Sequence, residues 1–275
     1  MTDIGIMQGR LLPPFEGRFQ AFPATGWQTE FHNAKAAGLD CIEWIYERPH
    51  EADNPLGSDA GLAQLQAVIE ETGVGVRSIC ADYYMEELLV DPLGNIRQTV
   101  ADHLKGLILQ AGKLSVIYIV LPFVDASSLT TEAQRSGLVR TLDELAKQAQ
   151  GAGLELHLET DLEPAIFRKL LDDINSPAVR ANFDIGNSAA LGYDPVIELR
   201  ALAPYLGSVH VKDRLLGGST VPLGTGNADF PTCFKMIRDT GFDRHFILQA
   251  ARGKNGDEIE LAARNRAFVE SYWAG

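Results

Sequence analysis

The chain has 275 residues, 45% of them hydrophobic, which is the composition of an ordinary globular protein with a large core. Its formal net charge of −13 opposes binding to nucleic acid or to an anionic membrane. Three scattered cysteines without a CxxC pair, no signal-peptide pattern at the start and no membrane-length apolar run indicate a cytoplasmic protein without disulfides.

Apolar runs typical of strands alternate with segments of helical period along the whole chain. The expected strands lie near residues 3–8, 40–45, 74–81, 116–121, 154–159, 179–184, 207–212 and 245–249. The expected helices lie near residues 27–38, 60–72, 97–112, 132–151, 162–174, 194–205, 230–240 and 256–273. About eight β–α units with no dividing linker predict a single (β/α)8 TIM-barrel domain over residues 1–275.

The longest irregular stretch, roughly residues 9–26, follows the first expected strand and contains Pro13-Pro14 and Phe22-Pro23. Loops of this length are usually disordered or functional. Active sites of TIM barrels lie at the carboxyl ends of the strands. We therefore expect this loop to act as a lid.

Polar side chains close four consecutive strands in the second half of the chain. They are Glu159, Asp184, His210 and Gln249. Alternation along each strand turns these side chains into the barrel, whereas the neighbouring leucines, valines and phenylalanines face outward. Three oxygen donors and one nitrogen donor that converge at one mouth are a ligand set for a divalent metal.

Three further motifs carry a family resemblance. Val209–Asp213 followed by Val221–Phe230 is similar to an HxKD…PxGxGxxDF pattern, Asp184–Asn187 to DxGN/H, and Gly38–Glu43 to GFDxIE. These are patterns of the sugar-phosphate isomerase/epimerase branch of the xylose isomerase-like TIM barrel superfamily. That superfamily includes sugar isomerases, ketose 3-epimerases, hexulose-6-phosphate epimerases, inosose dehydratases and endonuclease IV.

The resemblance implies a bound Mn²⁺, Mg²⁺, Co²⁺ or Zn²⁺ held by Glu159, Asp184 and His210. The sequence departs from the family at the fourth ligand, where the usual strand-eight glutamate is Gln249. A glutamine carbonyl can ligate a hard cation but carries no charge and takes no proton. The acid–base role of that glutamate in two-carboxylate epimerases cannot be transferred to Gln249, which leaves Lys212, Glu43 or a metal-bound water as the second proton donor.

We expect Glu159 to remove the proton next to the substrate carbonyl, with Lys212 contributing binding or electrostatic stabilisation. His157, one inward layer below, is expected to make a supporting hydrogen bond. Other polar residues at or near strand ends are expected to contact the substrate: Gln8, Arg10, Glu43, Asn187, Arg214 and Arg252.

The leading hypothesis is a divalent-metal isomerase or epimerase of a sugar or sugar phosphate. A one-base reaction needs no second proton donor, which favours isomerisation over epimerisation. The alternatives are a dehydratase acting on a polyol or keto sugar and a catalytically degenerate, carbohydrate-binding barrel. An endonuclease IV-like role is disfavoured by the six histidines and the negative charge. The expected partner is a small carbohydrate, and we expect no binding to nucleic acid or to a membrane. The sequence is compatible with a homo-oligomer.

Overall fold

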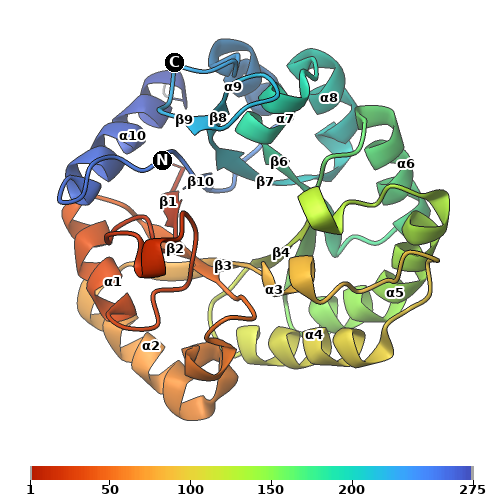
Figure 1. Cartoon of the computed structure of the whole chain (residues 1–275), viewed down its shortest axis with the longest axis horizontal. Helices are drawn as coiled ribbons and strands as arrows, with labels where there is room; N and C mark the ends of the chain where they lie inside the picture. Colours follow the sequence, from red (N-terminus) through yellow and green to blue (C-terminus); the bar gives the residue numbers. More distant parts are fainter. Residues whose placement is uncertain (1, 274–275) are drawn as a thin grey trace.

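The computed structural model describes residues 2–273 and contains a closed parallel barrel ringed by helices (Figure 1). The barrel order is β1-β10-β7-β6-β5-β4-β3-β2. The strands are β1 (Ile4–Met7), β2 (Cys41–Ile45), β3 (Gly75–Cys80), β4 (Tyr118–Phe123), β5 (Glu155–Thr160), β6 (Val179–Asp184), β7 (Leu206–Val211) and β10 (Phe246–Leu248). The predicted TIM barrel is confirmed, and each expected strand matches an observed one to within about two residues.

The outer ring consists of the helices expected from the helical period. They are α1 (Trp27–Ala36), α2 (Asp59–Thr72), α4 (Gln98–Ala111), α5 (Glu132–Gly151), α6 (Pro164–Ile174), α8 (Pro195–Leu202), α9 (Phe230–Asp239) and α10 (Glu258–Trp273). Local signals set their ends. Thr131 and Gln134 form a capping box at the start of α5. Gly73 ends α2 in the left-handed conformation at φ 77°. None of the helices within residues 2–273 is long and apolar enough to cross a membrane.

Short elements in the loops were not predicted. Besides single-turn 3-10 helices, they include α3 (Tyr83–Glu86), α7 (Ile185–Leu191) and an antiparallel ribbon of β8 (Asp213–Arg214) and β9 (Thr220–Val221). Each is too short for hydrophobic periodicity to reveal it. The two helices and the ribbon lie beyond the carboxyl ends of barrel strands, where they form part of the rim of the barrel mouth.

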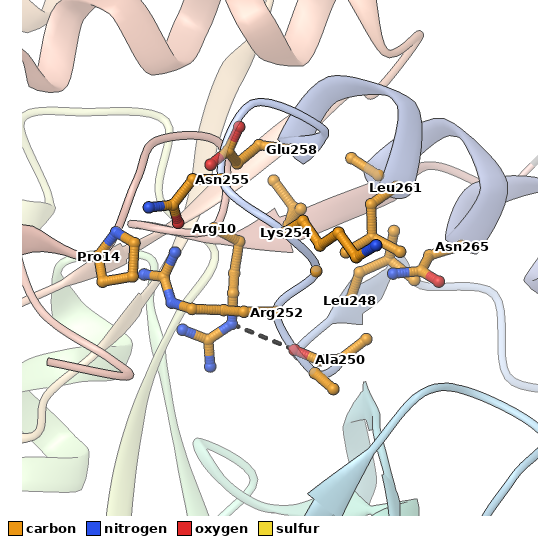
Figure 2. Close-up of a pocket in the computed structure, with 14 residues that line it drawn as sticks. Arg10, Pro14, Leu248, Ala250, Arg252, Lys254, Asn255, Glu258, Leu261 and Asn265 are labelled. Carbon is orange, nitrogen blue, oxygen red and sulfur yellow. Dashed lines mark hydrogen bonds between the residues drawn. The ribbon is translucent and has the colours of Figure 1, made fainter. Parts of the chain in front are cut away.

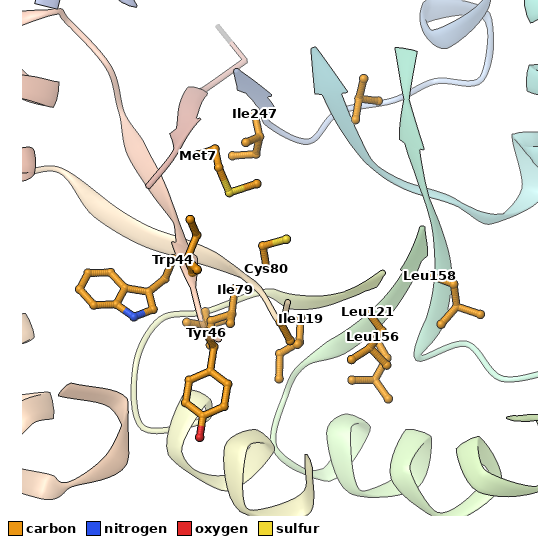
Figure 3. Close-up of a cluster of buried hydrophobic side chains, with 14 of the residues drawn as sticks. Met7, Trp44, Tyr46, Ile79, Cys80, Ile119, Leu121, Leu156, Leu158 and Ile247 are labelled. Atoms are coloured by element: carbon orange, nitrogen blue, oxygen red, sulfur yellow. The ribbon is translucent and has the colours of Figure 1, made fainter. Parts of the chain in front are cut away.

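The apolar core lies between the strands and the helices. Ile119 and Leu121 of β4 and Leu156 and Leu158 of β5 are fully buried there (Figure 3). Burying a leucine or isoleucine side chain contributes roughly 1.5–3 kcal/mol. The barrel interior has a different character because its middle layers are largely polar.

A hydrogen-bonded column of polar side chains fills that interior below Glu159. Asn182 Nδ2 donates to Glu159 Oε2 at 3.0 Å, and Ser208 Oγ donates to Asn182 Oδ1 at 2.7 Å. His157 joins the column through Nδ1, 2.8 Å from Ser208 Oγ, and through Nε2, 2.9 Å from Glu155 Oε2. Burial lowers the pKa of His157 to about 4, although Glu155 acts in the opposite direction. Buried polar groups need such partners, so the column fixes the position of Glu159.

The loop at residues 9–26 forms hydrogen bonds and an ion pair with residues that follow several strands. Phe22 N donates to Glu47 Oε1 at 2.7 Å, and Arg18 pairs with the same carboxylate at 2.5 Å. Gln20 contacts both Gln249, after β10, and Asp82, after β3. The loop therefore contacts residues that follow β2, β3 and β10, while its role as a lid stays a prediction.

Candidate functional site

Three predicted metal ligands converge at the carboxyl ends of β5, β6 and β7. Glu159, Asp184 and His210 each offer one ligand atom, and these atoms lie within 4.8 Å of one another. His210 Nδ1 is 3.3 Å from Glu159 Oε2 and 3.9 Å from Asp184 Oδ2. The three strands are neighbours in the barrel, and Asp184 pairs with His210 in register. All three side chains are buried, so the cluster can hold a cation away from bulk water.

Glu43 sets the orientation of the His210 ring. His210 Nε2 lies 2.7 Å from Glu43 Oε1, and Ser78 Oγ donates to the other oxygen, Oε2, at 2.6 Å. With Nε2 facing Glu43, Nδ1 faces Glu159 and Asp184. Burial lowers the pKa of His210, but Glu43 and Glu159 outweigh it and raise the pKa to about 10. Without a cation the imidazole therefore carries a proton among these carboxylates, and a divalent cation would replace that proton.

Asn187 holds the other side of Glu159. Its Nδ2 donates to Glu159 Oε1 at 2.7 Å, and its backbone N–H donates to Asp184 Oδ1 at 2.8 Å. The second contact makes Asp184 the N-cap of α7. Gly186 is required between them, because a Cβ there would lie 2.7 Å from Lys212 Cγ. The Asp-Ile-Gly-Asn segment thus presents one carboxylate to the cluster and orients another.

Lys212 and Arg214 add positive charge beside the cluster. Lys212 Nζ lies 2.9 Å from Asp184 Oδ2 and donates to Asn187 Oδ1 at 3.3 Å. Arg214 Nη1 donates to Asn187 Oδ1 at 2.9 Å, while its other nitrogens donate to Gly218 O. The two cations thus converge on the amide that fixes Glu159.

In the side-chain amide of Gln249, the nitrogen has a hydrogen-bond partner and the oxygen has none among the described residues. Its Nε2 donates to Gln20 Oε1 at 3.0 Å. Its buried carbonyl Oε1 has no hydrogen-bond partner among residues 2–273. An unpartnered buried oxygen is costly unless something else binds it. Together with two carboxylates and an imidazole nitrogen, this carbonyl fits the donor set of a divalent cation. Ligation by Gln249 stays a prediction.

Four residues expected at the substrate are used elsewhere in this structure. Glu43 is fully buried behind His210, and Gln8 Oε1 accepts from Ile45 N at 2.9 Å with 1% of the residue exposed. Arg10 donates to the carbonyls of Phe19 and Ala250 and to Gln20 Oε1, and Arg252 donates to the carbonyls of Gly9, Leu12 and Phe19. The bonds of Arg10 and Arg252 hold the loop at residues 9–26, and substrate contact by these four residues stays a prediction.

Figure 2 shows the small cavity beside these arginines, between the strand ends and α10. Arg10, Arg252 and Lys254 line it, together with apolar side chains such as Leu248 and Leu261. Its volume of about 30 Å³ has room for about one water and none for a sugar. The cavity does not include the Glu159 cluster.

Asp82 and Gln20 are part of the mouth but were not among the expected site residues. Gln20 Nε2 donates to Asp82 Oδ2 at 2.8 Å, and Gln20 Oε1 accepts from Gln249. Both residues lie in loops, where strand alternation gives no information about side-chain direction. Asn182, by contrast, lies two residues before Asp184 on the same strand face, so alternation does place it inside the barrel.

Comparison with known proteins identifies the family. The model of the xylose isomerase-like TIM barrel family matches residues 31–272, so the chain belongs to this family. Among curated proteins, L-ribulose-5-phosphate 3-epimerase UlaE of Escherichia coli (strain K12 / DH10B) is 26% identical over 258 residues, covering 90% of each chain. The resemblance found from the sequence motifs is thereby confirmed.

Solved structures share the fold over nearly the whole chain. An L-ribulose 3-epimerase has a TM-score of 0.75 at 20% identity and covers 100% of this chain and 95% of that one. The IOLI protein with a bound zinc atom has a TM-score of 0.77 at 17% identity, with both chains covered completely. The 3-keto-D-glucoside 4-epimerase YcjR of E. coli has a TM-score of 0.73 at 17% identity, covering 98% of this chain and 100% of that one.

Proposed function

We propose that this member of the xylose isomerase-like TIM barrel family is a divalent-metal-dependent isomerase or epimerase of a sugar or sugar phosphate. The observation that carries the proposal is the buried convergence of Glu159, Asp184 and His210 at adjacent strand ends, with ligand atoms within 4.8 Å of one another. The similarity to L-ribulose-5-phosphate 3-epimerase UlaE supports the same class of reaction.

The metal would be held by Glu159, Asp184 and His210, with the carbonyl of Gln249 as a fourth donor. When bound, the cation would polarise the carbonyl and hydroxyl oxygens of the substrate and stabilise negative charge there. Mn²⁺, Mg²⁺, Co²⁺ and Zn²⁺ all accept a set of two carboxylates, one imidazole and one amide oxygen.

Glu159 is the base in this proposal. Asn182 and Asn187 each donate to one of its oxygens, at 3.0 and 2.7 Å, so its carboxylate has a fixed position at the mouth. It would remove a proton from the carbon next to the substrate carbonyl. The Lys212 ammonium, held beside Asp184 at 2.9 Å, would bind a substrate oxygen and offset the charge that develops on it.

Proton exchange tests this proposal. A panel of ketoses, aldoses and their phosphates is incubated with the protein and Mn²⁺ in deuterated water and followed by NMR. We expect deuterium at the carbon next to the carbonyl of at least one sugar, and we expect Glu159→Gln to lose it while circular dichroism shows an unchanged fold. Exchange that persists in Glu159→Gln would exclude Glu159 as the base.

Gln249 favours a second candidate, a barrel of the same fold that binds carbohydrate without turnover. The family pattern has a glutamate at this position, and the neutral amide cannot transfer a proton. Binding of a sugar, measured by calorimetry, without exchange in any compound of the panel would favour this candidate. A dehydratase would share the first proton removal and differ by releasing water, which the same spectra detect as a new product.

A further inference from the structure

Epimerisation next to a carbonyl needs a proton-transfer group on each face of the substrate, and Glu159 supplies only one. Gln249 cannot supply the other, because a carboxamide is not an acid at neutral pH. Glu43 is fully buried behind His210, and the Lys212 ammonium is paired with the Asp184 carboxylate at 2.9 Å. Apart from a metal-bound water, the remaining source of this proton is another side chain at the mouth.

We propose that Asp82 is this second catalytic group, an inference that rests on the proposed function and narrows it to epimerisation. Asp82 follows β3, which lies across the closed barrel from β7, the strand of His210, and is separated from β5, the strand of Glu159, by β4 alone. Cys80, the last residue of β3, pairs with Val120 of β4. Two residues further along β4, Pro122 pairs with Glu159. Since Asp82 lies two residues past Cys80, this register places it at the height of Glu159.

An amide bridge joins Asp82 to the position where the family pattern has its second glutamate. Gln20 Oε1 accepts from Gln249 Nε2 at 3.0 Å and from Arg10 Nη2 at 3.1 Å. These two donors fix the amide orientation, so Gln20 Nε2 faces Asp82 Oδ2, to which it donates at 2.8 Å. Gln20 thus holds the Asp82 carboxylate within two hydrogen bonds of Gln249. Asp82 remains partly exposed, so a molecule in the mouth can reach it.

The raised pKa of the Asp82 carboxyl group suits a proton donor. Burial raises its pKa to about 6, against hydrogen bonds from Gln20 and Cys80 that lower it. In the forward reaction Glu159 takes the proton as the C–H bond breaks, and Asp82 gives its proton to the opposite face of the same carbon as the new C–H bond forms. One proton leaves the substrate and one arrives, and after product release the solvent returns both carboxyl groups to their starting states.

Asp82→Asn separates this role from that of Glu159. In deuterated water with Mn²⁺ and a sugar that the wild-type protein epimerises, we expect the variant to lose epimerisation by about 100-fold or more. Exchange with retained configuration should persist, since Glu159 alone removes and returns that proton. Mn²⁺ affinity, measured by calorimetry, should be unchanged, because Asp82 is not a ligand. Asp82→Glu, which restores an acid, should recover part of the epimerisation.

The control is Asp143→Asn, which removes an exposed carboxylate from α5 and should behave as the wild-type protein does. Epimerisation by Asp82→Asn within about threefold of the wild-type rate would overturn the proposal. Equal loss of exchange and epimerisation would also overturn it, because exchange needs only Glu159. A wild-type protein that neither exchanges nor epimerises any sugar of the panel would overturn the proposed function itself.

Discussion

His210 Nε2 lies 2.7 Å from Glu43 Oε1, and both side chains are fully buried. This contact turns Nδ1 toward Glu159 and Asp184. Partners of this kind fix the tautomer of a metal-binding histidine, and their loss typically costs 10–100-fold in affinity. Glu43 therefore acts on the site through His210.

We expect Glu43→Gln to weaken Mn²⁺ binding by roughly 10–100-fold, because the amide lacks the charge that orients and polarises the imidazole. Titration calorimetry on metal-free protein measures the change. Asp143→Asn serves as the control for a lost carboxylate outside the site. An unchanged affinity in Glu43→Gln would mean that Glu43 does not support a metal ligand.

Gln249→Glu should have the opposite effect and bind Mn²⁺ more tightly. The substitution places a negative charge beside the cation. It also removes the hydrogen bond from Gln249 Nε2 to Gln20, a loss of about 1 kcal/mol. We expect the charge to dominate. An equal or lower affinity, measured under the same conditions, would count against Gln249 as a ligand.

Two glycines give opposite predictions for the same change to alanine. At Gly186 a Cβ would lie 2.7 Å from Lys212 Cγ, so Gly186→Ala should displace Lys212 and destabilise the fold by about 1–3 kcal/mol. At Gly106, inside α4, a Cβ meets no atom of the described residues within 4 Å, so Gly106→Ala should stabilise by about 0.5–1 kcal/mol. Urea unfolding of the metal-free proteins compares them, and a shift of the same sign in both would contradict this account.

Glu198 predicts how stability depends on pH. Burial raises its pKa to about 7; the hydrogen bond from Ser188 lowers it and Asp184 raises it. Between about pH 4.5, where an unfolded glutamate titrates, and about pH 7, the unfolded chain releases a proton that the folded chain keeps. This contribution is present below that window and is lost as the pH rises, by up to about 3 kcal/mol.

Glu198→Gln should remove this part of the pH dependence, since the amide does not titrate and its oxygen can still accept from Ser188. Unfolding free energies of both metal-free proteins at pH 5 and pH 8 make the comparison. The difference between variant and wild type should favour the variant more at pH 8 than at pH 5. A constant difference would show that Glu198 titrates normally.

The barrel and the cluster of three candidate metal ligands follow from the sequence because strand alternation is a strong, local signal. The residues Glu159, Asp184 and His210 each end or nearly end an apolar run, and period two alone turns them inward. The family patterns then give the chemistry of the same positions. The helices of the outer ring could be predicted equally well, since each spans at least two turns of amphipathic pattern.

The contacts made by the loops could not be predicted from the sequence in this way. Nothing in the sequence shows that Arg10 and Arg252 donate hydrogen bonds to backbone carbonyls of the loop, such as that of Phe19. These carbonyls need side-chain donors because the irregular loop offers them no backbone partners, and this becomes visible only once the loop is folded. The bridge from Gln249 through Gln20 to Asp82 joins three segments far apart in the sequence. Such contacts depend on tertiary packing and leave no periodic pattern.

The central claim is that Glu159, Asp184, His210 and Gln249 bind one metal ion. A crystal structure of the protein with Mn²⁺, with the ion located by anomalous scattering, tests it most directly. We predict one anomalous peak about 2.0–2.6 Å from oxygens of Glu159, Asp184 and Gln249 and from Nδ1 of His210. A peak elsewhere, or coordination by His210 through Nε2, would contradict the account.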